Sequence, residues 1–93
     1  MALHELHPFS ESEIEKLPRK RGVYVLFQIE APIRADGAAN LHEALSRAKA
    51  EFPQASHFSV EALDTVDAMN QRLHKVREEL HLVRAVGFVG KRR

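Results

Sequence analysis

The 93-residue sequence contains no cysteine and no tryptophan, a single tyrosine, and only four glycines and four prolines. Without cysteine, the chain has no disulfide bond, no thiolate ligand for zinc and no cysteine nucleophile. No serine stands in the Gly-x-Ser-x-Gly context of a nucleophile elbow, and no glycine-rich phosphate-binding loop occurs. These absences exclude several large classes of enzyme.

Long apolar runs are also lacking. No segment approaches the length that crosses a membrane, and the first seven residues lack the basic stretch and apolar core of a signal peptide. The net charge of +1 at pH 7 argues against a protein that simply coats nucleic acid, but it allows a local basic patch. We therefore expect one domain over residues 1–93, located in the cytoplasm, with residues 1–9 as a loose N-terminal arm.

The stretch from Arg21 to Ile29 organises the expected fold, because it is the only long run of β-branched and aromatic residues in the first half of the chain. Alternate positions from Val23 to Ile29 are apolar, whereas the opposite face, which begins with Tyr24, is mixed. This pattern predicts a central strand that is covered by a helix on at least one face.

Three helices are predicted from capping residues and from apolar spacing. Ser10 with Glu13 forms a capping box for the first helix, and Asn40 is a good N-cap for the second. Asp64 or Thr65 caps the third and longest helix, which is defined by apolar residues that follow one another by three or four positions. The predicted helices cover residues 11–17, 41–52 and 66–80.

Two further strands are predicted, at residues 57–63 and 82–89, and residues 90–93 form a basic tail. Pro32 argues against a central strand, and Asp36-Gly37 is a strong turn signal, so residues 31–34 are expected to form a short edge strand at most. The predicted fold class is a small α/β (α+β) domain with a three-stranded, mainly antiparallel sheet and helices packed on it.

The expected core combines apolar residues of two strands and two helices. Each repeats at the spacing of its own element, so we expect all of them to be buried and packed on one another. They are Val23, Val25, Phe27, Leu45, Phe58, Val60, Leu73 and Val76.

The segment Leu17-Pro18, followed by Gly22-Val-Tyr-Val-Leu-Phe27, resembles the opening of GIY-YIG nuclease domains, where a leucine–proline pair precedes a Gly-Val-Tyr strand. Asn40-Leu41 with Leu45 is similar to the Asn-Leu pattern on the first core helix of that family. The resemblance spans roughly residues 10–80. It implies the GIY-YIG fold and, where the family's site is complete, a metal-dependent nuclease.

The chain departs from the family at the positions that carry the chemistry. The second motif, Tyr-Ile-Gly, would fall near Arg34-Ala35-Asp36 and is absent, and the helix arginine falls on Ala44. The metal-binding glutamate falls near residues 70–72, which carry no carboxylate. In the family the tyrosines and the arginine activate water and stabilise charge at phosphorus, while the glutamate holds the divalent ion. Only Tyr24 remains as a catalytic candidate, so the resemblance implies the fold and argues against the activity.

The leading hypothesis is a non-catalytic binding or interaction module without a cofactor, with weak, non-specific binding to nucleic acid. One alternative is a divergent magnesium-dependent endonuclease that uses Tyr24 and Phe88-Val-Gly-Lys91, which reads like a displaced second motif. Another is a protein-interaction domain that forms a homodimer through an uncovered sheet edge. The six histidines offer no set of three or four convergent ligands, so no metal site is expected.

Two basic clusters are the candidate phosphate-binding residues. They meet only if the strand at residues 82–89 runs antiparallel beside the strand at residues 22–29, which brings the end of one next to the start of the other. Apart, they are solvated charges that serve solubility. The candidates are Arg19, Lys20, Arg21, Lys91, Arg92 and Arg93.

Overall fold

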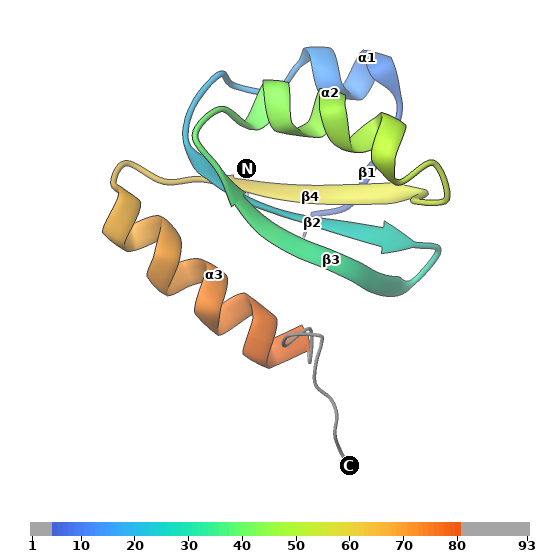
Figure 1. The fold of residues 1–93 in the computed structure, drawn as a ribbon. Coiled ribbons are helices and arrows are strands. Elements are labelled where there is room, and N and C mark those ends of the chain that lie inside the picture. The colour runs from blue at the N-terminus through green and yellow to red at the C-terminus, as the bar shows by residue number, and fades with distance from the viewer. Residues whose placement is uncertain (1–4, 81–93) are drawn as a thin grey trace.

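The computed structural model of the chain describes residues 5–80, which form an antiparallel sheet between two layers of helices (Figure 1). Helices α1 and α2 cover one face of the sheet, and α3 covers the other (Figure 1). The elements are β1 (His7–Pro8), α1 (Glu11–Glu15), β2 (Gly22–Gln28), β3 (Ala31–Ala38), α2 (Leu41–Glu51), β4 (His57–Ala62) and α3 (Val66–Leu80). The predicted α+β class is confirmed, and the predicted strand at residues 82–89 lies outside the described residues.

The sheet has four strands, in the order β1-β4-β2-β3, where the sequence predicts three. β1 comes from the segment that the sequence assigns to a loose arm. Its two residues pair antiparallel with residues 57 and 58 of β4, and the buried Phe9 follows directly. Such a short strand carries no recognisable alternation, so only its partner reveals it.

β3 is the second correction, because it extends over eight residues and not over the short edge segment that the sequence predicts. Pro32 is tolerated since β3 lies at the edge of the sheet, where a missing N–H need not cost a ladder bond. The register with β2 shifts directly beside this residue, because Phe27 lies opposite Pro32 whereas Leu26 lies opposite Arg34. Farther along, the Asp36 side chain accepts the Gly37 N–H at 2.8 Å inside the paired strand. Pairing with β2 therefore overrides the local turn tendency.

Side-chain oxygens cap all three described helices, as the sequence predicts. In each case the oxygen accepts the backbone N–H three residues later. The pairs are Ser10 and Glu13 at 3.4 Å, Asn40 and Glu43 at 3.1 Å, and Thr65 and Ala68 at 3.0 Å. The caps fix the starts of the helices and, for α2, the position of its first turn over the sheet.

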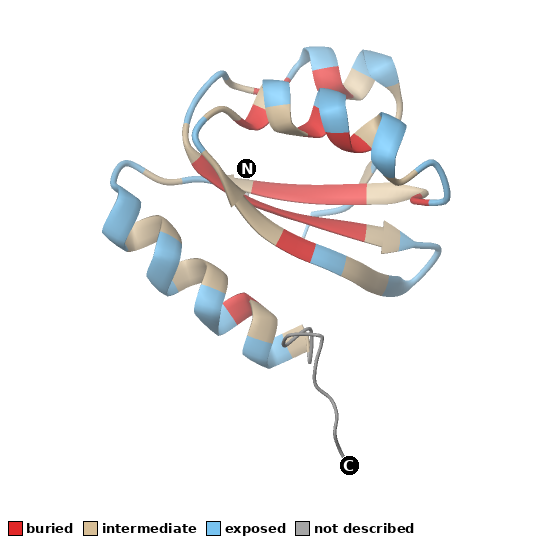
Figure 2. Cartoon of the chain, viewed as in Figure 1, coloured by how far each residue is buried: buried red, intermediate tan, exposed pale blue. Residues whose placement is uncertain are grey.

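The apolar residues form two clusters, so the prediction of a single mutually packed core is wrong. Buried residues lie on the strands and in both helix layers (Figure 2). Successive residues of β2 point to opposite faces: Tyr24 and Leu26 pack under α1 and α2, whereas Val25 packs against α3. The larger cluster also contains Leu45, Phe58 and Val60, and the smaller one contains Val76 with the half-buried Phe27 and Leu73 at its margin. The two clusters lie on opposite faces of the sheet, so the sheet separates them.

Gly22 begins β2 at a point that has no room for a side chain. A Cβ atom there would overlap the main-chain oxygen of Glu61 on β4 and the side chain of Leu41 on α2. Glycine therefore allows two strands and a helix to come together at one end of the sheet. Two residues later, Tyr24 lies under the same helix.

α3 buries fewer of its residues than α2 does. Of its residues only Val76 is buried, with Leu73 and Leu80 partly covered by the sheet. An ion pair between Arg72 and Glu61 of β4, at 2.8 Å, adds a polar tether. None of the helices between residues 5 and 80 is long and apolar enough to cross a membrane.

Because neighbouring residues of β2 belong to different clusters, we expect alanine substitutions at these positions to lower the free energy of unfolding by different amounts. Leu26→Ala should lower the free energy of unfolding by about 2–5 kcal/mol, because Leu26 is fully buried and its removal leaves an enclosed cavity. Phe27→Ala should cost less, because Phe27 is half-buried at the margin of the smaller cluster. Urea denaturation measures both values. An equal or larger cost for Phe27→Ala would contradict this division of the core.

Candidate functional site

A polar cavity of about 380 Å³ opens between α2 and the strands β2 and β3. The tyrosine of the expected motif, Tyr24, forms part of its wall, and so does Ala44, at the position where the family resemblance places an arginine. The charged residues of the wall are Arg34, Asp36, Glu43, Arg47 and Glu51.

Strand register explains why the strand residues meet in this cavity. Tyr24 lies opposite Asp36 and Leu26 lies opposite Arg34 across the β2–β3 pair, so Tyr24, Arg34 and Asp36 share one face of the sheet. The sequence pattern assigns no role to Arg34 and Asp36, which are named only because they replace the expected second motif. Their spacing of two residues was the available signal, but it became informative only once β3 was known to be a strand.

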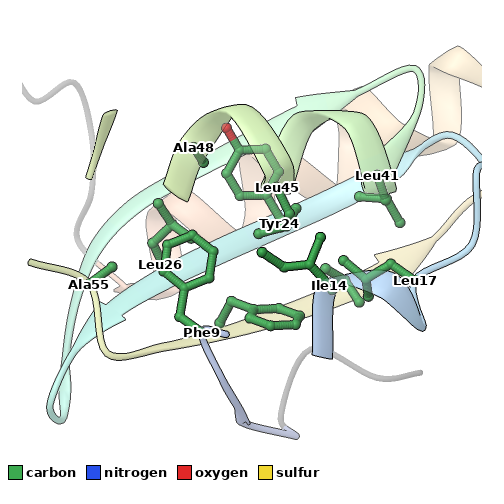
Figure 3. Close-up of a cluster of buried hydrophobic side chains, with 11 residues drawn as sticks. Phe9, Ile14, Leu17, Tyr24, Leu26, Leu41, Leu45, Ala48 and Ala55 are labelled. Carbon is green, nitrogen blue, oxygen red and sulfur yellow. The ribbon is translucent and has the colours of Figure 1, made fainter. Parts of the chain in front are cut away.

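Tyr24 is almost fully covered, with 7% of its surface exposed. Its ring packs in the larger apolar cluster, and its hydroxyl oxygen lies at the rim beside α2 (Figure 3). Burial raises the pKa of the phenol above its ordinary value near 10, and the neighbouring Arg34 guanidinium partly offsets this shift. The phenol therefore keeps its proton at neutral pH.

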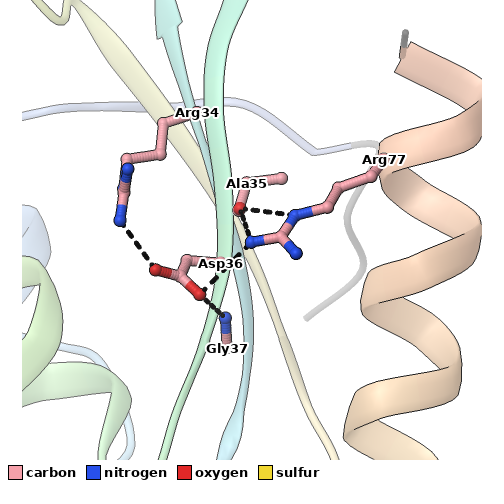
Figure 4. A network of polar contacts seen from close by, with 5 residues as sticks. All are labelled: Arg34, Ala35, Asp36, Gly37 and Arg77. Atoms are coloured by element: carbon pink, nitrogen blue, oxygen red, sulfur yellow. Dashed lines mark hydrogen bonds and ion pairs between the residues drawn. The ribbon is translucent and has the colours of Figure 1, made fainter. Parts of the chain in front are cut away.

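Asp36 joins two arginines that come from different layers of the fold (Figure 4). Its Oδ2 atom lies 2.8 Å from Nη2 of Arg34, and its Oδ1 atom lies 3.5 Å from Nη2 of Arg77 on α3. Arg77 also donates from Nε and Nη2 to the main-chain oxygen of Ala35, at 3.2 and 3.0 Å. Nothing in the sequence pattern pointed to Arg77, which is about 40 residues away from both partners along the chain.

The first turn of α2 borders the cavity, but its N–H groups already have acceptors. Free N–H groups at a helix start are a common binding site for anions. Here the N–H groups of Leu41, His42 and Glu43 donate to the Lys20 oxygen at 2.9 Å, the Pro18 oxygen at 3.3 Å and the Asn40 side chain at 3.1 Å, respectively. The helix start therefore offers these three groups to its own chain and not to a phosphate.

The charges around the cavity nearly cancel. Two guanidinium groups, those of Arg34 and Arg47, face the three carboxylates of the wall, and Arg77 adds a third cation from the side of α3. Arg47 also lies 3.7 Å from Glu43, one turn earlier on α2. A strongly anionic ligand therefore gains little net attraction here.

A divalent cation does not fit the described residues well. Between residues 5 and 80, no three or more histidine, aspartate or glutamate side chains are grouped so that they could hold a metal ion. Residues 70–72 of α3, where the resemblance expects a glutamate, are Asn-Gln-Arg. Asp36, the carboxylate nearest to Tyr24 in the strand register, is occupied by two arginines and the Gly37 N–H.

The basic residues predicted to bind phosphate are not brought together within the described structure. Arg19 and Lys20 are exposed in the turn before β2, and Arg21 donates to the main-chain oxygen of Asp64 at 3.1 Å. The second cluster, Lys91 to Arg93, lies outside the described residues, as does the displaced motif at residues 88–91. Among the described residues, both sides of β2 are occupied, by β4 and β3.

Comparison with known proteins supports the fold assignment. No family model and no curated protein sequence matches the chain. Among solved structures, the GIY-YIG N-terminal endonuclease domain of UvrC from Thermotoga maritima matches with a TM-score of 0.68 and 16% identity, over 82% of this chain and 93% of that one. That structure is an asparagine-to-alanine mutant bound to its catalytic divalent cation. A tyrosine-to-phenylalanine mutant of the same domain matches with a TM-score of 0.65 and 13% identity, over 75% of this chain and 87% of that one.

The chain thus has the fold of GIY-YIG endonuclease domains, as the resemblance at Gly22-Val-Tyr24 implied. At this level of identity the likeness establishes the fold, and the chemistry has to be argued from the residues of the cavity. Those residues are Tyr24 together with a network of charges that the resemblance did not predict.

Tyr24 is the only tyrosine in a chain without tryptophan, so its ionisation can be followed directly. Its absorbance should titrate with a midpoint above pH 10, and Arg34→Gln should move the midpoint higher still, because a cation that favours the phenolate is lost. Since the folded phenol holds its proton more strongly than the unfolded chain does, stability should fall as the pH rises past 10. Ultraviolet titration of folded protein, with urea-unfolded protein as the reference, measures this. A midpoint at or below that of the unfolded chain would contradict the buried phenol.

Proposed function

We propose that this domain is a non-catalytic binding module on a nuclease-like fold, which binds nucleic acid weakly and without sequence preference. The observation that carries the proposal is the contact of Arg34 and Arg77 with Asp36, in the place where the resemblance expects the second catalytic motif. These charged groups satisfy one another, so they stabilise the edge of the sheet and are not free to activate water.

The chemistry of the individual side chains supports the absence of catalysis. An arginine at position 34 is always protonated and cannot accept a proton from water. Ala44 provides no cation for charge that develops at phosphorus, and residues 70–72 provide no carboxylate for a metal ion. The phenol of Tyr24 is protonated at neutral pH, which leaves it a hydrogen-bond donor.

Weak binding to nucleic acid follows from where the cations lie. The basic turn at Arg19 and Lys20 adjoins the start of α2, because the Lys20 oxygen accepts the N–H of Leu41 next to the cavity residue Asn40. Arg34 and Arg47 could add contacts to phosphate from within the cavity. The neighbouring carboxylates oppose such contacts, so the affinity should be low and should depend strongly on salt.

The alternative of a homodimer joined through a sheet edge is less favoured at β3. The guanidinium of Arg77 reaches that strand and takes the main-chain oxygen of Ala35 as an acceptor. Pro32 removes one backbone donor from the same strand. Both features are ways in which proteins discourage strand addition at an edge.

Catalytic silence is the first test of the proposal. With magnesium or manganese, the purified protein should not nick supercoiled plasmid DNA above the level of a boiled sample, because the groups expected to hold the metal and to stabilise charge are missing. Gel electrophoresis of the plasmid measures nicking. Nicking by the wild type that disappears in Tyr24→Phe would overturn the proposal and favour the divergent endonuclease.

Binding is the second test. Labelled single- and double-stranded DNA should bind with a dissociation constant of roughly 10⁻⁶ to 10⁻⁴ M at physiological salt, and more tightly at low salt, because each neutralised phosphate releases a counterion. Fluorescence anisotropy at two salt concentrations measures this, and Lys20→Gln or Arg34→Gln should weaken it. Lys16→Gln is a matched control, since it removes one positive charge from a lysine that is paired with Glu13 outside the cavity.

The C-terminal cluster can be tested in the same titration. Deletion of residues 91–93 should weaken binding if Lys91, Arg92 and Arg93 contribute phosphate contacts. Unchanged affinity would remove these three residues from the proposed site, and absence of binding at low salt would remove nucleic acid as the ligand.

A further inference from the structure

Asp36 is the point where the cavity and α3 meet. Arg34 approaches this carboxylate from inside the cavity, and Arg77 approaches it from α3 (Figure 4). The two contacts are unequal: the Arg34 pair is 2.8 Å long, whereas the Arg77 pair is 3.5 Å long. The two guanidinium groups therefore share one carboxylate through different oxygens, Arg34 at Oδ2 and Arg77 at Oδ1, and the Arg34 contact is the shorter one.

α3 is the layer that a change in this sharing would affect. Val76 is the only buried residue of this helix, and Met69, Leu73 and Leu80 add partly buried apolar contacts with the sheet. Its polar tethers are the contacts of Arg77 with Ala35 and Asp36 and the pair between Arg72 and Glu61. Elements with few buried apolar contacts open locally at low free-energy cost, and a change in one tether is a measurable fraction of that cost.

We propose that the charge of the ligand in the cavity controls how firmly α3 is held on the sheet, through Asp36. This inference rests on the proposed function, because it takes the ligand to be an anion such as a phosphate group. An anion that binds Arg34 draws the guanidinium away from Asp36, and the carboxylate then pairs more fully with Arg77. Filling the cavity with an anion thus tightens α3.

The coupling is reciprocal. When Arg77 takes a larger share of Asp36, Arg34 is released for the anion, so docking of α3 and binding of the anion favour each other by the same factor. One exposed ion pair accounts for about a twofold to fivefold change in an equilibrium constant. Binding of the anion therefore changes the docking equilibrium of α3 modestly and does not act as an all-or-none switch.

Hydrogen exchange of the α3 amides, followed in the full chain, tests the coupling first without any ligand. Arg34→Gln imitates the withdrawal of the guanidinium from Asp36, and it should slow exchange at Val76 and its neighbours by about twofold to fivefold. Arg47→Gln is the matched control, because it removes a cavity arginine that pairs with Glu43 and leaves Asp36 untouched. Exchange in Arg34→Gln that equals that of the wild type would overturn the proposal.

The second arm adds inorganic phosphate to the wild type and compares it with chloride at equal ionic strength. Phosphate should slow exchange in α3 by a similar factor, and Asp36→Asn should abolish this response. Glu61→Gln, which removes the other tether, should speed exchange and keep the response to phosphate. Saturable binding of phosphate at the cavity without any change in α3 would overturn the coupling while leaving the binding function intact.

The two arms separate the coupling from the proposed function. Slowed exchange in Arg34→Gln, combined with no binding of phosphate to the wild type, would support the link through Asp36 and count against an anion as the ligand. Slowed exchange in both arms supports the link and the ligand class together.

Discussion

The pairing of β2 with strands on both of its sides is the constraint on which the rest of the structure depends. It places residues 22–27 of β2 in a fixed register with both β3 and β4, so alternate side chains must point to one helix layer or the other. It also places Tyr24, Arg34 and Asp36 on the same face. The division of the core into two clusters and the composition of the cavity are both consequences of this one arrangement.

The shape of the cavity and the charges inside it depend on different residues. The strand, the close approach at Gly22 and the capped helix over Tyr24 are the features that build the pocket, and they depend on packing and backbone geometry. The charged residues inside it are free of that requirement. Here Arg34 and Arg77 both pair with Asp36. These ion pairs place charged groups along the edge of the sheet and connect α3 to β3.

The same network is the reason for proposing a binding module and not a nuclease. A metal-dependent nuclease needs unpaired acceptors for its cation and unpaired cations near phosphorus. In the cavity, Asp36 is already shared between Arg34 and Arg77, and the first N–H groups of α2 donate within the chain. A polar pocket whose groups satisfy one another is better suited to weak recognition than to catalysis.

The sequence by itself determined the features that local physics encodes: the caps at Ser10, Asn40 and Thr65, the course of β2, and the likeness at Gly22-Val-Tyr24 that identified the fold. Only the tertiary structure decided that β3 passes through Pro32, that the core has two halves, and that Arg77 meets Asp36. The physical reason is the range of the interactions. Caps and periodicity act within one or two turns, whereas an edge strand and an ion pair between distant residues depend on a partner that the local pattern does not contain.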